Sequence, residues 1–139
     1  MPNKNHDALN AGKRKVILVV DDEPGMVAMV GDYLTLRGYR VFTAYDGQEG
    51  LDVAKKIKPD MIILDIMMPR MDGYEMLERL KKDKDTVSIP VIMLSAKTED
   101  KDKLKAAKLC SEIYITKPVE LDDLGKKIET VFNIVGGGL

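Results

Sequence analysis

The chain has 139 residues, of which 45% are hydrophobic and 32% are charged, and its formal net charge is -1. A chain of this size buries about two-thirds of its extended surface on folding, so one globular domain needs no disulfide or structural metal. The balanced charge excludes the strongly basic surface of a nucleic-acid-binding domain, and the apolar content excludes a disordered chain.

Several other kinds of chemistry lack the residues that they need. Cys110 is the only cysteine, so it cannot form an internal disulfide, and no spacing of cysteine and histidine resembles a zinc site. The only histidine, His6, lies in a polar N-terminal stretch. The longest aliphatic run, residues 16–20, is too short to cross a bilayer, and residues 1–15 lack the apolar core of a signal peptide. We therefore expect a cytoplasmic protein without membrane contact.

The first strand and helix follow a polar stretch. Residues 1–14 predict a flexible N-terminal arm. Residues 16–20 are apolar at every position and rich in β-branched side chains, which is typical of a central parallel strand. Three acids follow, and Pro24 then begins a helix whose apolar residues recur at helical spacing until Gly38.

The next two units repeat this alternation. Residues 40–45 alternate polar and apolar, which favours a strand near the sheet edge, and a turn at 46–47 leads into a helix. A fully apolar run, residues 61–64, ends in Asp65 and predicts a strand that is buried on both faces. The helix after it begins at about Gly73.

Two further strand–helix units complete the domain. Residues 91–94 predict a buried strand before Ser95, and a lysine-rich helix covers about 98–109. Residues 113–116 predict the fifth strand, and an apolar stripe marks a helix from 121 to 132. Five strands alternating with five helices favour an α/β fold, a doubly wound sandwich with helices on both faces of a parallel sheet. It spans residues 15–134, and residues 135–139 form a C-terminal tail or the remnant of a linker.

Polar residues follow four of these strands, at the point where each strand ends. Because the carboxyl ends of parallel strands share one edge of the sheet, we expect their side chains to gather there. Carboxylates in one crevice raise each other's pKa unless a cation neutralises them, and an all-oxygen ligand set suits Mg²⁺. Taken singly, an acid here could cap a helix and the lysine could pair with an acid. The residues are Asp21, Asp22, Glu23, Asp65, Ser95 and Lys117.

This set of residues is suited to phosphoryl transfer. Asp65 can attack a phosphorus atom in line, while Lys117 and a metal neutralise charge on the transferring group. Ser95 can donate a hydrogen bond to that group. The expected product is an aspartyl phosphate.

Four segments resemble the receiver domain of two-component response regulators. They are Val-Val-Asp-Asp-Glu-Pro at 19–24, Leu-Asp-Ile-Met-Met-Pro-Arg-Met-Asp-Gly at 64–73, Val-Ile-Met-Leu-Ser-Ala-Lys at 91–97 and Tyr-Ile-Thr-Lys-Pro at 114–118. The resemblance implies a five-stranded flavodoxin-like (CheY-like) three-layer sandwich with strand order 2-1-3-4-5. It also implies a signalling module rather than an enzyme.

The resemblance assigns roles to particular residues. Asp65 matches the phosphoacceptor, which receives phosphate from a sensor histidine kinase or phosphotransfer protein. Asp21 and Asp22 match acids that hold Mg²⁺, together with Asp65 and the main-chain carbonyl of Met67. Lys117 matches the phosphate-binding lysine, with a cis bond to Pro118, and Ser95 and Tyr114 match the switch pair.

The resemblance also implies an output surface on the fourth helix, fifth strand and fifth helix. This surface is basic, which suggests an acidic partner or a second copy of the domain. Its lysines are Lys101, Lys105 and Lys108 on one face of the fourth helix and Lys126 and Lys127 on the fifth. Most lysines are simply exposed, so a solvated face is the competing interpretation. We expect no direct binding of nucleic acid. Residues 110–113, in the loop before the fifth strand, depart from the family's usual Gly-Ala-Asp-Asp.

Three alternative functions compete with this interpretation of the sequence. A haloacid-dehalogenase-type hydrolase also forms an aspartyl phosphate, but its acid/base aspartate would fall at Met67. A flavodoxin-type module has the same topology, but the acids after the first strand would repel a flavin phosphate. A third alternative is a receiver fragment of a longer regulator whose output domain is missing.

Overall fold

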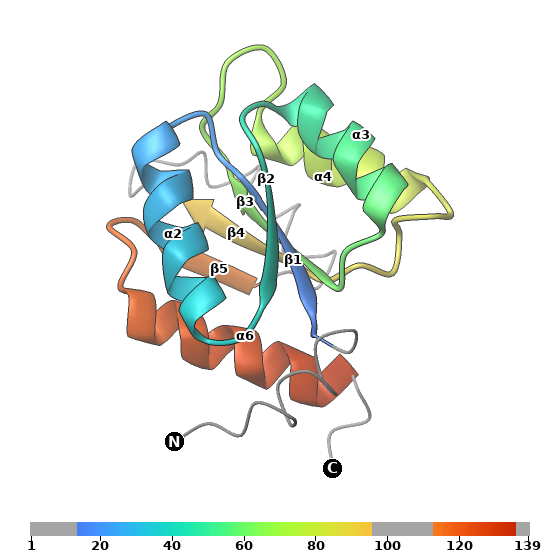
Figure 1. Cartoon of the computed structure of the whole chain (residues 1–139). Coiled ribbons are helices and arrows are strands. Elements are labelled where there is room, and N and C mark those ends of the chain that lie inside the picture. The colour runs from blue at the N-terminus through green and yellow to red at the C-terminus, as the bar shows by residue number, and fades with distance from the viewer. Residues whose placement is uncertain (1–13, 96–112, 136–139) are drawn as a thin grey trace.

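The computed structural model describes residues 14–95 and 113–135, which form a parallel sheet with helices on both faces (Figure 1). The strand order is β2-β1-β3-β4-β5, and every neighbouring pair is parallel. This confirms the expected fold class and strand order. The strands are β1 (Val16–Val20), β2 (Arg40–Ala44), β3 (Met61–Asp65), β4 (Val91–Ser95) and β5 (Ile113–Thr116).

Of the helices that the structure describes, two cover each face of the sheet (Figure 1). The described helices are α2 (Pro24–Leu36), α3 (Gly47–Ile57), α4 (Gly73–Lys82) and α6 (Leu121–Val135). None of these helices is long and apolar enough to span a bilayer. The helix expected at 98–109, including Lys101, Lys105 and Lys108, lies outside the described residues, as do residues 1–13 of the expected arm and the tail from 136 onward.

Alternation along the central strands creates two cores. Leu18 and Val20 of β1 pack with α3 and α4 on one side, whereas Ile17 and Val19 pack with α2 and α6 on the other. All five residues of β3 are buried, because this strand lies in the middle of the sheet with helices on both faces. The prediction that this apolar run forms a strand buried on both faces is therefore confirmed.

Side-chain caps fix where two helices begin. Asp46 Oδ1 accepts a hydrogen bond from the Glu49 N–H at 2.7 Å, so α3 begins directly at Gly47 and the expected turn is the start of the helix. Asp72 caps α4 in the same way. Both helix starts are thereby fixed next to the carboxyl edge of the sheet.

Candidate functional site at the carboxyl edge of the sheet

Three aspartates meet where β1 and β3 end. The two strands are paired with Val20 opposite Leu64, so Asp21 and Asp65 follow at neighbouring positions. Asp21 and Asp65 are only 1% and 2% exposed, whereas Asp22 is exposed. One carboxylate oxygen from each of the three lies within 4.8 Å of the others. The expected acidic cluster is therefore present.

Lys117 reaches this cluster from β5. Its Nζ lies 2.7 Å from Asp65 Oδ1 and 3.7 Å from Asp21 Oδ2. Its main-chain N–H donates to Ser95 O at 2.7 Å, which ties the residue after β5 to the end of β4. The expected cis bond between Lys117 and Pro118 is present. One ammonium group thus faces two buried carboxylates.

Burial controls the charge of these groups. Burial, together with the charge of Asp21, raises the pKa of Asp65 to about 6, although the hydrogen bond from Lys117 acts to lower it. Burial also raises the pKa of Asp21, against a hydrogen bond from the Glu23 N–H. Burial acts to lower the pKa of Lys117, but its contacts with Asp65 and Asp21 outweigh this effect, so its pKa is raised. The site therefore holds more negative charge than its one lysine neutralises.

The donor set fits a divalent cation. Asp21 Oδ2 is buried and, within residues 14–95 and 113–135, has no hydrogen-bond partner. A buried carboxylate oxygen without a hydrogen bond is costly, and its ion pair with Lys117 is long at 3.7 Å, so a closer cation would satisfy it. All three clustered side chains offer oxygen, which is the ligand type of Mg²⁺ rather than of zinc. Neither Asp21 nor Asp22 caps α2, because its N-cap is Glu23, which makes no side-chain cap.

The remaining expected site residues lie on β4, on β5 and in the loop after β3. Ser95 ends β4 and is buried, and β4 lies between β3 and β5. Tyr114 of β5 is half-buried against the core on the α3 and α4 side. Met67 is 62% exposed, so its side chain does not belong to the core.

Sequence reasoning missed one residue that shapes the site. A Cβ on Gly73 would lie 2.5 Å from Asp65 O and 2.7 Å from Ile66 Cα, so only glycine fits here. Its N–H donates to Ile66 O at 2.8 Å and closes the loop that follows Asp65. In the sequence, its place directly after Asp72 suits any helix start, and it is the last residue of the segment at 64–73 that resembles receivers.

Comparison with known proteins agrees with this geometry. Residues 17–129 match the family model described as the response regulator receiver domain. The chain belongs to this family. Its fold and its acidic edge are thus those of a receiver, a signalling module of two-component systems.

Individual relatives show the same relationship. The chain is 39% identical over 117 residues to the alkaline phosphatase synthesis transcriptional regulatory protein PhoP of Bacillus subtilis, covering 84% of this chain and 48% of PhoP. Chemotaxis protein CheY4 of Vibrio cholerae superposes with a TM-score of 0.77 at 31% identity, covering 85% of this chain and 98% of that one. A receiver-protein domain from Methanoculleus marisnigri has 43% identity and a TM-score of 0.69, covering 84% and 94%. The chain spans about half the length of the first curated relatives that it matches.

Proposed function

We propose that Asp65 accepts a phosphoryl group from a phosphohistidine of a sensor histidine kinase or phosphotransfer protein. The observation that carries the proposal is the contact of 2.7 Å between Lys117 Nζ and Asp65 Oδ1, beside the acidic cluster. Asp65 is buried at the end of a central strand, where solvent competes little with the incoming group. Its pKa of about 6 leaves it mostly ionised, and so nucleophilic, at neutral pH.

The step is a simple displacement at phosphorus. An oxygen of Asp65 forms a bond to phosphorus while the bond from phosphorus to the donor's imidazole nitrogen breaks, and the imidazole leaves with the bonding electron pair. Lys117 lies where it can neutralise charge on the phosphoryl oxygens. Ser95 supplies a hydroxyl donor at the end of the adjacent strand.

Mg²⁺ is the cofactor that we propose for this site. Asp21, Asp22, Asp65 and the carbonyl of Met67 would hold it, and it would supply positive charge to the phosphoryl group. The buried Oδ2 of Asp21, which accepts no hydrogen bond within the described residues, supports this assignment.

Phosphorylation would then change a surface that other proteins bind. We propose that Ser95 moves toward the phosphoryl group and that Tyr114 takes the space that Ser95 leaves. This movement would bias the conformation of the face formed by the helix expected at 98–109, β5 and α6. The partner would be a protein or a second copy of the domain. PhoP is named a transcriptional regulatory protein and is about twice as long. The leading alternative is therefore that this receiver is a fragment of a longer regulator and controls an output domain of that regulator.

A hydrolase with turnover is the weaker candidate. A haloacid-dehalogenase-type mechanism needs an acid/base aspartate two residues after the nucleophile, and Met67 occupies that position. Rapid, continuous hydrolysis of a generic phosphate ester would favour this candidate over a receiver.

The first test of the proposal uses acetyl phosphate as donor. In the presence of Mg²⁺, intact-mass measurement should show the parent protein gaining one phosphoryl group. The Asp65→Asn variant should gain none, because an amide is not a nucleophile here. If the variant gained phosphate as the parent does, the assignment of Asp65 would be wrong.

A further inference from the structure

The loop between β3 and α4 is tied down at both ends. The Ile66 N–H donates to Leu94 O at 3.1 Å, and the Gly73 N–H donates to Ile66 O at 2.8 Å. The side chains of Met68 and Met71 are buried in the core between these points. Met67, whose carbonyl is a proposed Mg²⁺ ligand, therefore lies in a short segment held from both sides.

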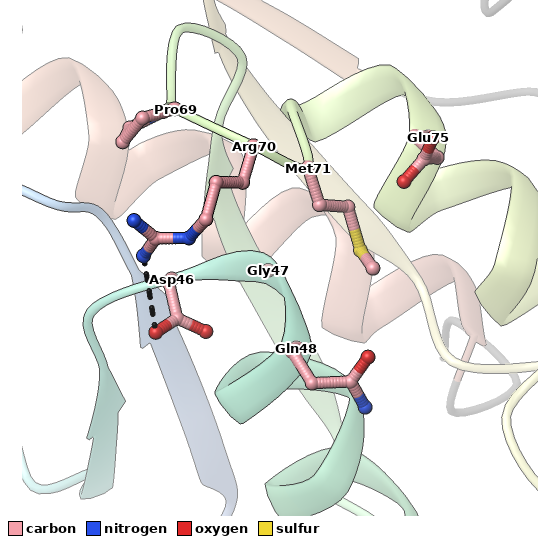
Figure 2. A pocket seen from close by; sticks show the side chains of 7 residues that line it. All are labelled: Asp46, Gly47, Gln48, Pro69, Arg70, Met71 and Glu75. Atoms are coloured by element: carbon pink, nitrogen blue, oxygen red, sulfur yellow. Dashed lines mark ion pairs between the residues drawn. The ribbon is translucent and has the colours of Figure 1, made fainter.

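Arg70 is the residue of this loop whose backbone conformation is unusual. Its φ is 66°, in the left-handed region that glycine or asparagine adopts more readily. Its guanidinium is directed at the start of α3, where Nη2 lies 3.8 Å from Asp46 Oδ2 (Figure 2). Arginine thus occupies a backbone conformation that favours glycine, and the ion pair with Asp46 gives a reason for a long cationic side chain at this position.

Asp46 joins this ion pair to the rest of the site. Its Oδ1 caps α3 while its Oδ2 faces Arg70, so a residue fixed by a helix cap holds the arginine. Two residues earlier, Ala44 O accepts a hydrogen bond from the Asp21 N–H at 3.2 Å. The corner between β2 and α3 thus contacts both the segment of Asp21 and the segment of Met67.

The packing beside the ion pair is open. A hollow of about 300 Å³ lies between the corner that joins β2 to α3 and the loop that joins β3 to α4. Its lining includes Asp46, Gln48, Arg70 and Glu75 (Figure 2). Below it, Met71 lies so close to Gly47 that a Cβ there would be 2.8 Å from Met71 Sδ. Beside that contact, the ion pair between Arg70 and Asp46 is a polar link across the hollow.

We propose that Arg70 is a positioning residue for the metal site. Its ion pair with Asp46 fixes the conformation of the loop at Met67 and thereby raises the affinity for Mg²⁺. This inference rests on the proposed function, since it concerns the metal of that site. The pair is too exposed to stabilise the whole fold much, because the Arg70 side chain is 76% exposed. Its effect is expected in the loop.

The sign of the effect separates positioning from simple electrostatics. Removing a cation near an acidic metal site should, by Coulomb attraction alone, strengthen binding of Mg²⁺ or leave it unchanged. Loss of a positioning contact should weaken it. The Arg70→Gln variant should therefore bind Mg²⁺ more weakly by roughly two- to fivefold, the range expected for an exposed ion pair.

The experiment is a calorimetric titration of MgCl₂ into the unphosphorylated protein. Arg79→Gln is the matched control, because it removes the same charge from an exposed arginine paired with Glu75 at 3.7 Å. Arg70→Lys should restore most of the affinity. In an Asp46→Asn background, where asparagine keeps the helix cap, Arg70→Gln should have no further effect.

A second readout follows the loop itself. Without Mg²⁺, amide hydrogen exchange in residues 66–72 should be faster in Arg70→Gln than in the parent, at an unchanged unfolding temperature. Equal or tighter Mg²⁺ binding by Arg70→Gln, with a parent that binds the ion, would overturn this inference and leave the proposed function standing. A parent that binds no Mg²⁺ would overturn the metal site and this inference together.

Discussion

Lys117 Nζ lies 2.7 Å from Asp65 Oδ1 and 3.7 Å from Asp21 Oδ2, so a single ammonium bridges the ends of β1 and β3. Both carboxylates are almost completely buried, and both have a raised pKa despite this contact. One lysine neutralises the pair incompletely, which is why the site favours a further cation. The following predictions depend on this arrangement.

Replacing Lys117 by methionine should separate phosphorylation from metal binding. The rate of labelling by acetyl phosphate should fall by roughly tenfold or more, the effect expected when a charge-assisted hydrogen bond is lost. Affinity for Mg²⁺ should not fall, because a competing cation has been removed. Lys127→Met, which takes the same charge from an exposed lysine paired with Asp123, is the control and should change neither quantity. Weaker Mg²⁺ binding in Lys117→Met would contradict the account.

Asp65 makes the metal-free protein less stable as the pH rises. Its carboxyl ionises near 3.8 in the unfolded chain and at about 6 in the folded protein, so the folded state holds the proton more tightly. The free energy of unfolding should therefore fall between about pH 4 and pH 6, and the cost should be fully present above that range. In chelator at about pH 7.5, Asp65→Asn should be more stable than the parent by roughly 1–2 kcal/mol. Urea denaturation should show this gain shrinking toward pH 4.

Mg²⁺ should stabilise the folded parent. A ligand that binds only the folded state adds about 1.4 kcal/mol when its concentration is about tenfold above the dissociation constant. Asp22→Ala should abolish the increase in unfolding temperature, since it removes a proposed ligand. Because Asp22 is exposed, its metal-free stability should stay within roughly 0.5 kcal/mol of the parent. An unchanged response to Mg²⁺ in this variant would exclude Asp22 as a ligand.

Gly73 should be far less replaceable than Gly25, although both lie in the first turn of a helix. A Cβ at Gly73 meets the main chain of Asp65 and Ile66, which cannot move cheaply, whereas a Cβ at Gly25 meets nothing within 4 Å. Gly73→Ala should cost roughly 1–3 kcal/mol of unfolding free energy. Gly25→Ala should be neutral or stabilising by up to about 1 kcal/mol. Thermal denaturation of the two variants tests this contrast.

Much of the fold could be predicted from the sequence because parallel strands simplify the problem. The apolar runs before Asp21 and Asp65 predicted buried strands, and a parallel sheet brings the ends of such strands to one edge. The side chains at this edge could therefore be predicted to lie together although they are far apart in the sequence. The strand order itself came from the resemblance to receivers, because apolar runs do not state which strands are neighbours.

Contacts made by backbone geometry could not be predicted in the same way. The requirement for glycine at Gly73 comes from its approach to Asp65 O, which no local pattern encodes. The edge strand was expected to include Tyr45, but the Tyr45 N–H donates to Glu49 Oε1 and the strand ends at Ala44. The ion pair between Arg70 and Asp46 depends on a left-handed residue, which arginine does not suggest.

Chemical trapping of the phosphorylated residue tests the central claim most directly. Borohydride reduces an aspartyl phosphate to homoserine, so peptide mapping of the protein after acetyl phosphate, Mg²⁺ and borohydride treatment identifies the acceptor. The account predicts homoserine at position 65 and unmodified carboxylates at Asp21, Asp22 and Glu23. Homoserine at position 21 or 22, or an unmodified residue 65 in protein that has gained phosphate, would contradict it.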